Sequence, residues 1–269
     1  MHKSDKTNDQ FSLSGKHAVV TGAGGGIGSA IARQLHAQGA KVSLLGRNEA
    51  KLESVARELN DSQVITVDVS NAESVNQAFE KARSSFGPID ILVNNAGVAL
   101  SSPYLKQTPE QWQQTMAVNL DGVHFCTQAA LPDMIGDQNG RKQWGRIINI
   151  ASTAAQKGYA YVAGYVASKH AVLGLTRALA VEYANRSITI NAVCPGFTDT
   201  EIVANALDNI MAVTGRSREA ALSELLKDNP QKRLIQPEEV ANVVQWLCLD
   251  TSNSITGQAI SVAGGEVMS

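Results

Sequence analysis

The sequence predicts an α/β protein built on a doubly wound parallel β-sheet with helices on both faces, folded as a single domain. Short β-branched segments alternate along the chain with longer amphipathic segments of helical period, which is the pattern of successive βαβ units. Segments such as ILVNNAG and RIINIAS are apolar almost throughout, as strands of a sheet covered on both faces must be. A length of 269 residues, of which 43% are hydrophobic, supplies one large core.

In the first half of the chain, expected strands and helices alternate. β-Branched runs predict strands over residues 16–22, 41–46, 62–69 and 89–97. Amphipathic periodicity predicts helices over residues 29–39, 48–60, 71–87 and 109–134. The first of these helices is expected to end at Gly39, since glycine is the usual residue just past a helix terminus.

The second half continues this alternation. Strands are expected over residues 145–152, 188–196 and 257–265, and helices over residues 163–184 and 237–249. Residues 197–230 are polar and helical in pattern, and we expect them to form a mobile lid. Residues 1–12 are expected to form a flexible arm ahead of a single domain over residues 13–269.

Composition excludes several classes of function. The net charge of −2 gives no reason to expect nucleic acid or an anionic membrane as a partner. No apolar run reaches membrane-spanning length, and the polar start MHKSDKTNDQ lacks the apolar region of a secretory signal, so a cytoplasmic protein is expected. No His, Cys or Asp group has metal-ligand spacing, so no metal is expected. The widely separated cysteines are interpreted as core residues in a reducing compartment: Cys126, Cys194 and Cys248.

A glycine-rich turn joins the first expected strand to the first helix. The segment TGAGGGIG places Gly22, Gly26 and Gly28 in the spacing T-G-x-x-x-G-x-G, and Ile27 begins the buried stripe of the helix that follows. Glycines allow a tight turn and close approach of the backbone to a pyrophosphate, while the helix N-terminus supplies N–H groups and a positive dipole. Because the turn lies in the first βαβ unit, we predict a nucleotide site of Rossmann type rather than an unliganded turn.

The segment YVASK holds Tyr165 and Lys169 four positions apart. Positions with this spacing share one face of a helix, so the phenol and the ammonium can lie side by side. Two unrelated surface residues would give the same spacing. The pair therefore indicates a catalytic site only if other segments of the chain support that interpretation.

From Leu13 to the C-terminus, the chain resembles the short-chain dehydrogenase/reductases. Four segments carry this resemblance in the order found in the family: TGAGGGIG, NNAG at residues 94–97, YVASK, and PGFTDT at residues 195–200. Each segment is short, but four in order at the family's spacing are a strong signal. The resemblance implies an NAD(P)-dependent oxidoreductase that moves a hydride between a nicotinamide cofactor and a carbonyl or secondary alcohol.

The resemblance also implies a catalytic tetrad. Tyr165 is then the general acid or base, while Lys169 lowers its pKa and holds the nicotinamide ribose. The serine that stands 13 positions before the tyrosine is Ser152, which is expected to contact the substrate together with Tyr165. Asn119, in MAVNLDG, matches the asparagine that completes the tetrad.

Hydride transfer to or from a carbonyl carbon makes or consumes an alkoxide, so a proton must move as well. Free tyrosine titrates near ~10, too high for a good base at neutral pH. The Lys169 ammonium and an oxidised nicotinamide are expected to lower the pKa of Tyr165. Ser152 can donate to the carbonyl oxygen, and Asn119 is expected to fix a water that links Lys169 to solvent.

Other hydroxyls near YVASK compete for these roles. Tyr161 lies four positions before Tyr165, and Tyr159 is close by, but the lysine spacing selects Tyr165. Tyr159 is expected to line the substrate cleft. Thr153 could replace Ser152 as the donor, although the spacing from the tyrosine favours Ser152.

The remaining ionisable side chains near these motifs receive structural interpretations. The histidines of the long helices are interpreted as packing or surface residues: His124 and His170. The acidic residues of PGFTDTE are interpreted as solvated groups at a helix start: Asp199 and Glu201.

The end of the second expected strand, LLGRN, bears on the choice of cofactor. NAD-preferring members of the family usually carry an acidic residue there, whereas this chain has Arg47. A guanidinium suits a 2′-phosphate in charge and in geometry, so NADP is expected over NAD. Many NADP-using members carry a second basic residue in the glycine turn, where this chain has Gly25.

The other cofactor contacts implied by the resemblance are Asp68 and Val69 at the adenine, Asn95, Ala96 and Gly97 at the adenosine ribose, and Pro195, Gly196, Thr198 and Thr200 at the nicotinamide and phosphates.

The segments around YVASK and PGFTDT look most like those of β-ketoacyl and polyketide ketoreductases and of 3-hydroxyacyl-thioester dehydrogenases. The expected substrate is therefore a 3-oxoacyl thioester or a related ketone. The alternative is NAD-dependent oxidation of a secondary alcohol or a 3-hydroxyacyl-CoA. A non-catalytic nucleotide-binding protein would not need Ser152, Tyr165 and Lys169 together, and a sugar-nucleotide epimerase would need a larger C-terminal domain.

Two features of the sequence concern partners. Long helices that are apolar on more than one face must bury the second face somewhere, and a homotetramer is expected from this pattern and from the resemblance. Arg186 matches a basic position that contacts acidic carrier protein in acyl-carrier reductases. The segment GDQNGRKQW is long for the family, and either is a plain surface loop or alters partner contacts.

Overall fold

The computed structural model describes residues 12–136 and 143–268. The expected N-terminal arm lies outside the described residues except for Ser12. The long loop GDQNGRKQW is described only at its ends, at Gly136 and at Gln143 and Trp144.

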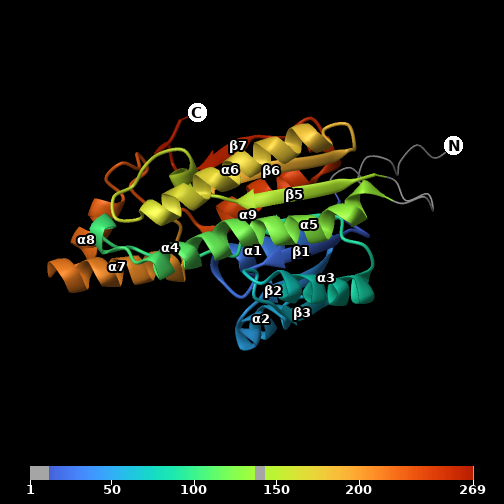
Figure 1. Cartoon of the computed structure of the whole chain (residues 1–269), viewed down its shortest axis with the longest axis horizontal. Helices are drawn as coiled ribbons and strands as arrows, with labels where there is room; N and C mark the ends of the chain where they lie inside the picture. The colour runs from blue at the N-terminus through green and yellow to red at the C-terminus, as the bar shows by residue number, and fades with distance from the viewer. Residues whose placement is uncertain (1–11, 137–142, 269) are drawn as a thin grey trace.

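A seven-stranded parallel sheet forms the centre of the molecule, confirming the predicted fold class (Figure 1). Its strands lie in the order β3-β2-β1-β4-β5-β6-β7, and the direction of winding reverses between β1 and β4. In sheets of this kind, ligands bind at the carboxyl ends of the strands beside that reversal. The strands are β1 (His17–Thr21), β2 (Lys41–Gly46), β3 (Ser62–Thr66), β4 (Ile91–Asn94), β5 (Gly145–Ile150), β6 (Ile188–Pro195) and β7 (Ala259–Val262).

Helices cover both faces of the sheet, and each face has its own hydrophobic core. One core joins α1, α2 and α9 to the sheet, and the other joins α3, α5 and α6. The helices are α1 (Gly26–Ala37), α2 (Glu49–Ala56), α3 (Ala72–Phe86), α4 (Pro109–Met116), α5 (Gly122–Ile135), α6 (Ala163–Tyr183), α7 (Glu201–Thr214), α8 (Arg218–Leu225) and α9 (Pro237–Cys248). All three cysteines are buried and free, as predicted for core residues.

Local sequence explains where several helices begin and end. Asn48 and Asn71 cap α2 and α3 by accepting from backbone N–H groups of the first turn. Thr108 and Gln111 form a capping box at α4, with proline in the first turn. Gly39 follows α1 with φ +93°, a conformation that glycine adopts most readily.

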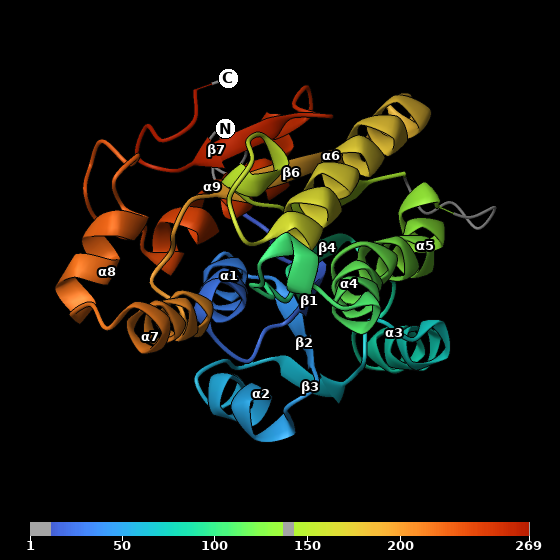
Figure 2. The same ribbon diagram turned by 60° about the vertical axis from the view of Figure 1, so that its left-hand side comes forward.

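The expected helix over residues 109–134 is interrupted. Between α4 and α5 the segment Ala117–Asp121 forms a π-helical turn, η3. Here the ladder of hydrogen bonds takes in one extra residue, which the apolar periodicity does not reveal. The expected lid region contains two helices, α7 and α8, which lie together at the end of the molecule to which the strands point (Figures 1 and 2).

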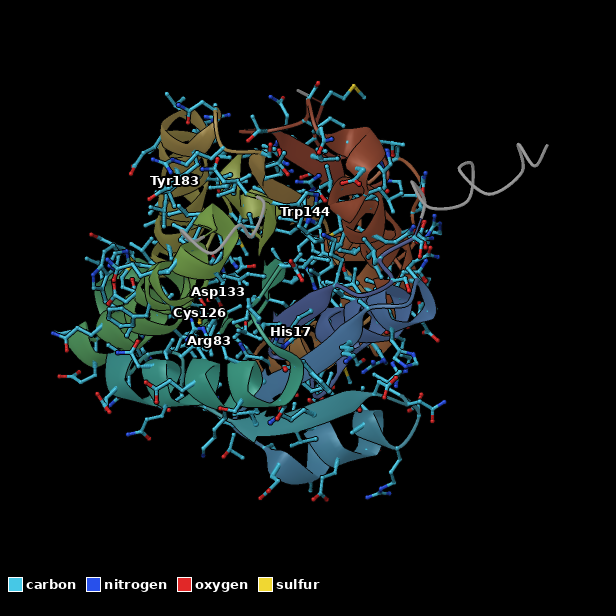
Figure 3. The ribbon with its side chains drawn as sticks, turned by 90° about the vertical axis from the view of Figure 1, so that its right-hand side faces the viewer. His17, Arg83, Cys126, Asp133, Trp144 and Tyr183 are labelled. Atoms are coloured by element: carbon cyan, nitrogen blue, oxygen red, sulfur yellow. The ribbon has the colours of Figure 1, made fainter. Side chains whose placement is uncertain are left out.

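The opposite end of the sheet is held by polar pairs (Figure 3). Asp133 of α5 accepts from Arg83 of α3 at 2.8 Å and joins the two helices. His17, at the start of β1, contacts the Gly87 carbonyl and the Ser43 hydroxyl, each at 2.9 Å. These contacts tie neighbouring elements together and give this end a structural role.

Candidate active site

The glycine turn between β1 and α1 leads directly into the N-terminus of a helix. Gly22 and Gly26 have φ of +66° and +52°, and α1 starts directly from Gly25 without a side-chain cap or an acidic residue in its first turn. A Cβ at Gly28 would collide with the Gly22 carbonyl. The turn therefore leaves the helix N-terminus open toward an anion, and its residues fit the pyrophosphate of a dinucleotide.

The turn is held in shape by the segment after β4. The Asn95 amide donates to the carbonyls of Thr21 and Gly22 at 3.0 and 3.1 Å. The Thr21 hydroxyl accepts from the backbone N–H groups of Asn95 and Ala96 at 3.0 and 3.1 Å. Asn95 thus fixes the turn through its side-chain nitrogen, and its expected place at the adenosine ribose stays a prediction.

The carboxyl end of β5 and the first turns of α6 bring together the three expected reactive side chains. Lys169 is 5% exposed, and its ammonium donates to the Ile150 carbonyl at 2.8 Å. The Lys169 Nζ lies 5.7 Å from the centroid of the Tyr165 ring. Ser152 lies close enough to the Tyr165 phenol to favour its ionised form.

Burial shifts the pKa of both titratable groups in this cluster. Loss of solvent lowers the pKa of Lys169 to about 8. The pKa of Tyr165 is raised, because burial outweighs the effect of Ser152. In the protein alone the desolvated phenolate is therefore the less favourable form, and the expected lowering by Lys169 together with an oxidised nicotinamide stays a prediction.

The Ser152 hydroxyl belongs to the reactive cluster. Its oxygen accepts from the Ala154 backbone N–H at 3.0 Å, and its O–H lowers the pKa of Tyr165 by donating to the phenol. The hydroxyl of its neighbour Thr153 instead lies 2.6 Å from the Tyr159 hydroxyl.

Asn119 lies in the π-helical turn and is fully buried. Its side chain accepts from the Val98 N–H at 2.8 Å and donates to the Val98 carbonyl at 2.9 Å and to the Ser168 hydroxyl at 3.0 Å. Both N–H groups of the side-chain amide are thereby used, and the expected water stays a prediction. Asn119 fixes the segment after Gly97 to α6 next to Lys169, because Ser168 directly precedes that lysine.

At the expected adenosine end, Arg47 is exposed directly after β2. Asp68 accepts from the backbone N–H and hydroxyl of Ser70 at 3.0 and 2.6 Å. These bonds, with a smaller contribution from the charge of Arg47, lower the pKa of Asp68. Val69 is 7% exposed and packs toward Gly122, so only its backbone is available to a ligand.

The segment after β6 reaches back over the glycine turn. Pro195 ends β6, and the Thr198 hydroxyl donates to the Gly196 carbonyl at 3.0 Å. A Cβ on Gly26 would lie 3.0 Å from the Thr200 methyl group. The residues expected at the nicotinamide therefore stand across the sheet edge from those expected at the pyrophosphate.

One ion pair at this place was missed from the sequence. Lys51 of α2 contacts Glu201, the first residue of α7, at 2.7 Å, and the Lys51 Cβ would lie 3.0 Å from a Cβ on Gly24. Glu201 stands at the start of α7 with its side chain 74% exposed, as the interpretation as a solvated residue requires, but its carboxylate is also paired across the turn. The partners are 150 positions apart, and no local pattern indicates the contact.

Arg186, the expected carrier contact, lies beyond the C-terminal end of α6, whereas Tyr165 lies in the first turn of that helix. A helix of 21 residues is roughly 30 Å long. A carrier held at Arg186 would therefore sit far from the reactive cluster.

Among residues 12–136 and 143–268, no group of three His, Cys, Asp or Glu side chains could hold a metal ion. In the same part of the chain, none of the helices combines the length and hydropathy needed to cross a membrane.

A doubly wound sheet with an anion-binding turn beside a serine, a tyrosine and a lysine defines a dinucleotide-dependent oxidoreductase. The family model described as enoyl-(acyl carrier protein) reductase matches residues 22–266. The chain belongs to the short-chain dehydrogenase/reductase family.

Curated relatives match along nearly the whole chain. A putative ketoacyl reductase of monensin polyketide synthase from Streptomyces virginiae is 39% identical over 92% of this chain and 95% of its own length. The 3-oxoacyl-acyl-carrier-protein reductase of Aquifex aeolicus is 35% identical over 95% of this chain and 99% of its own. Nodulation protein G of Rhizobium sp. is 37% identical over 96% and 99%. The crystal structure of an actinorhodin polyketide ketoreductase with NADPH superposes with a TM-score of 0.88, at 35% identity over 96% of this chain and 98% of that one.

Proposed function

We propose that this protein reduces a 3-oxoacyl thioester to the 3-hydroxyacyl thioester with NADPH. The observation that carries the proposal is the cluster of Ser152, Tyr165 and Lys169 at the carboxyl end of β5, next to an open dinucleotide turn. The curated relatives named as ketoacyl and 3-oxoacyl reductases support the substrate class. The ketoreductase structure with NADPH supports the cofactor.

The side chains suit the reductive direction. Bound NADPH supplies the hydride. The O–H of Ser152 donates to the substrate carbonyl oxygen and stabilises the charge that develops there. Tyr165, whose pKa is raised by burial, stays protonated at neutral pH and gives its proton to that oxygen. Lys169, with a pKa of about 8, remains mostly charged at neutral pH and assists this proton transfer by stabilising the phenolate that is left.

The residues that would hold the cofactor form a continuous set along the carboxyl edge. Arg47 stands where a 2′-phosphate would be recognised, and nothing acidic occupies its position in the chain. The backbone of the glycine turn would hold the pyrophosphate. The residues assigned to the adenosine side are Arg47, Asp68, Val69, Asn95, Ala96 and Gly97, those at the pyrophosphate are Gly22, Gly26, Ile27 and Gly28, and those at the nicotinamide side are Tyr165, Lys169, Pro195, Gly196, Thr198 and Thr200.

Three finer statements belong to the same proposal. Residues 197–230, with α7 and α8, act as a lid over the site. The protein works in the cytoplasm on a small-molecule substrate, either a CoA ester or a carrier-bound acyl group. It assembles as a homotetramer, for which the exposed face of α6 gives a physical reason discussed below.

A substrate panel tests the proposal. The purified protein is mixed with NADPH or NADH and with a 3-oxoacyl thioester, a simple ketone or a 2-enoyl thioester, and nicotinamide absorbance is followed. The 2-enoyl thioester is included because the matching family model is described as an enoyl reductase. The reverse reaction is followed with secondary alcohols and a 3-hydroxyacyl thioester. We expect the fastest turnover with the 3-oxoacyl thioester and NADPH. Faster reduction of the 2-enoyl thioester, or turnover of none of these compounds, would overturn the proposal.

A further inference from the structure

A buried carboxylate stands behind the candidate substrate site. Glu266 follows β7 near the end of the chain, and its side chain is only 2% exposed. Its Oε1 accepts from the Tyr159 hydroxyl at 2.5 Å and lies 3.0 Å from the Lys157 ammonium. Lys157 and Tyr159 both belong to the loop between β5 and α6, the loop that also carries Ser152.

Tyr159 connects Glu266 to the reactive cluster. The Tyr159 hydroxyl also lies 2.6 Å from the hydroxyl of Thr153, the residue next to Ser152. The Tyr159 ring meets that of Phe197 edge to face at 5.9 Å, and Phe197 follows β6. One phenol thus joins the C-terminal tail to the two loops that flank the site.

Hydrogen-bond direction in this chain of groups is fixed by the carboxylate. An ionised carboxylate only accepts, so the single proton of the Tyr159 hydroxyl goes to Glu266. The Tyr159 oxygen must then accept from Thr153, whose own proton is used in doing so. Of the two adjacent hydroxyls, only that of Ser152 keeps its proton on the side of Tyr165, where a substrate carbonyl could accept it.

The other carboxylate oxygen supports a role in fixing loops. Glu266 Oε2 is buried without a hydrogen-bond partner among the described residues. It would lie 3.2 Å from a Cβ on Gly196, so the carboxylate packs directly against the loop expected at the nicotinamide. Leaving an oxygen unpaired at such depth costs free energy. The contacts of the other oxygen with Tyr159 and Lys157 offset part of this cost, and the carboxylate thereby orders both loops.

We propose that Glu266 is a positioning residue for the reduction assigned above. Through Tyr159 it holds the loop between β5 and α6 and keeps the Thr153 proton in a hydrogen bond to the Tyr159 oxygen. Ser152 is then the hydroxyl that donates to the substrate carbonyl. This inference rests on the proposed function. Tyr159 accordingly meets the substrate with its ring and not with its hydroxyl, which refines its expected place in the cleft.

Steady-state kinetics test the proposal. Because one lost hydrogen bond to a charged group corresponds to a factor of about ten or more, we expect Glu266→Ala and Tyr159→Phe each to lower kcat/KM for the 3-oxoacyl thioester about ten-fold, mainly through KM. In Tyr159→Phe, which leaves the Glu266 carboxylate packed against Gly196, the KM for NADPH should stay within about two-fold. The double variant should be little worse than either single one, because both remove the same contact. Glu266→Gln keeps an acceptor for Tyr159 and should recover most of the loss.

Asp228→Asn is the matched control, because Asp228 also contacts Lys157, at 3.6 Å, but does not reach Tyr159. It should leave kcat/KM within about two-fold. An equal loss in Asp228→Asn, an unchanged substrate KM in Glu266→Ala, or a parallel rise in the KM for NADPH in Tyr159→Phe would each overturn the positioning role.

Hydrogen–deuterium exchange gives a second readout that does not depend on turnover. Glu266→Ala and Tyr159→Phe should both speed exchange in residues 152–160 while the strands keep their protection. Unchanged exchange there would contradict the inference even if the panel identified no substrate. Turnover of no panel compound, together with faster exchange in this loop, would instead reject the proposed function and keep the loop assignment.

Discussion

Tyr165 is the residue on which the proposed chemistry depends most directly. Tyr165→Phe removes the proton and leaves the ring, so turnover should fall by more than about a hundred-fold while NADPH affinity stays within a few-fold. Fluorescence titration with NADPH and initial rates measure the two effects separately. Tyr161→Phe is the control, because its ring is 65% exposed. Substantial activity left in Tyr165→Phe would point to another acid, with Tyr161 the first to examine.

Lys169 illustrates the cost of keeping a charge inside the site. Its pKa falls from 10.5 to about 8 in the folded protein, so at neutral pH burial of the charge costs about 3 kcal/mol. Lys169→Met should abolish turnover and weaken NADPH binding, yet raise the free energy of unfolding by about 1–2 kcal/mol. This gain is smaller than the cost of burying the charge, because the Ile150 carbonyl loses its hydrogen-bond donor.

The pH dependence of that stability difference has a definite sign. Because the pKa of Lys169 is lower in the folded protein, the buried charge destabilises the fold by its full amount below about pH 8. This destabilisation disappears as pH rises from about 8 to 10.5. Denaturant unfolding of the native protein and Lys169→Met at pH 7 and at pH 10 measures this. A gain that is absent at pH 7, or that grows with pH, would show that the ammonium is not held at a cost.

Arg47 decides the cofactor in the proposed site. Arg47→Asp removes a guanidinium–phosphate pair and places a carboxylate against the phosphate, which together should cost NADPH about 2–4 kcal/mol. The ratio of kcat/KM for NADPH to that for NADH should therefore fall by about two orders of magnitude. Arg57→Asp, at the C-terminal end of α2 and so at the opposite end of that helix from Arg47, should leave the ratio unchanged. A ratio that is equally unchanged in Arg47→Asp would place the 2′-phosphate elsewhere.

Among the elements, the strands and most helices follow from the sequence, because each carries its own signal. The apolar runs mark the strands within a few residues, and Gly39 marks the end of α1 as expected. The π-helical turn at Ala117–Asp121 does not follow, because π and α segments share nearly the same apolar periodicity. The Asn119 contacts with Val98 and Ser168 depend on that turn.

Side-chain contacts between segments that are distant in the sequence could not be predicted either. The motif residues Ser152, Tyr165 and Lys169 are close in sequence, and a single loop and helix place them together. Glu266 and Tyr159 are 107 positions apart, and neither belongs to a recognised motif. Only the three-dimensional closure of the tail over the loop brings them into contact.

The ion pair between α2 and α7 gives a prediction about the lid. Lys51 and Glu201 bridge the glycine turn, but their side chains are 49% and 74% exposed, so the pair should contribute less than about 1 kcal/mol to stability. We expect it instead to hold α7 over the bound cofactor. Lys51→Ala and Glu201→Ala should leave Tm within a few degrees and speed NADPH dissociation about two- to five-fold.

Stopped-flow fluorescence of NADPH measures that dissociation rate. The charge exchange Lys51→Glu with Glu201→Lys keeps an ion pair across the turn and should restore the native rate. Single variants that release NADPH at the native rate would show that the pair does not restrain the lid.

At the scale of the whole molecule, α6 presents a second face that nothing within the described chain covers. Val181 is 82% exposed, and a Cβ added at Gly174 would meet no atom within 4 Å. β7 is an edge strand that pairs only with β6, and Met268 beyond it is 85% exposed. Open edge strands and apolar helix faces are places where chains associate, so the molecule offers two separate surfaces for contact with further copies.

We expect these surfaces to form the two interfaces of a homotetramer, the α6 face around one two-fold axis and the β7 edge around another. Light scattering at micromolar concentration should give four times the chain mass of 28.5 kDa. Val181→Asp places a charge in the first interface and should reduce the assembly to dimers. Val213→Asp, on the lid helix α7 where Val213 is 78% exposed, is the matched control and should leave the mass unchanged. A native species at the mass of one chain would reject both interfaces, and a native dimer unaffected by Val181→Asp would reject the α6 face alone, because only the edge strand would then remain to join the two copies.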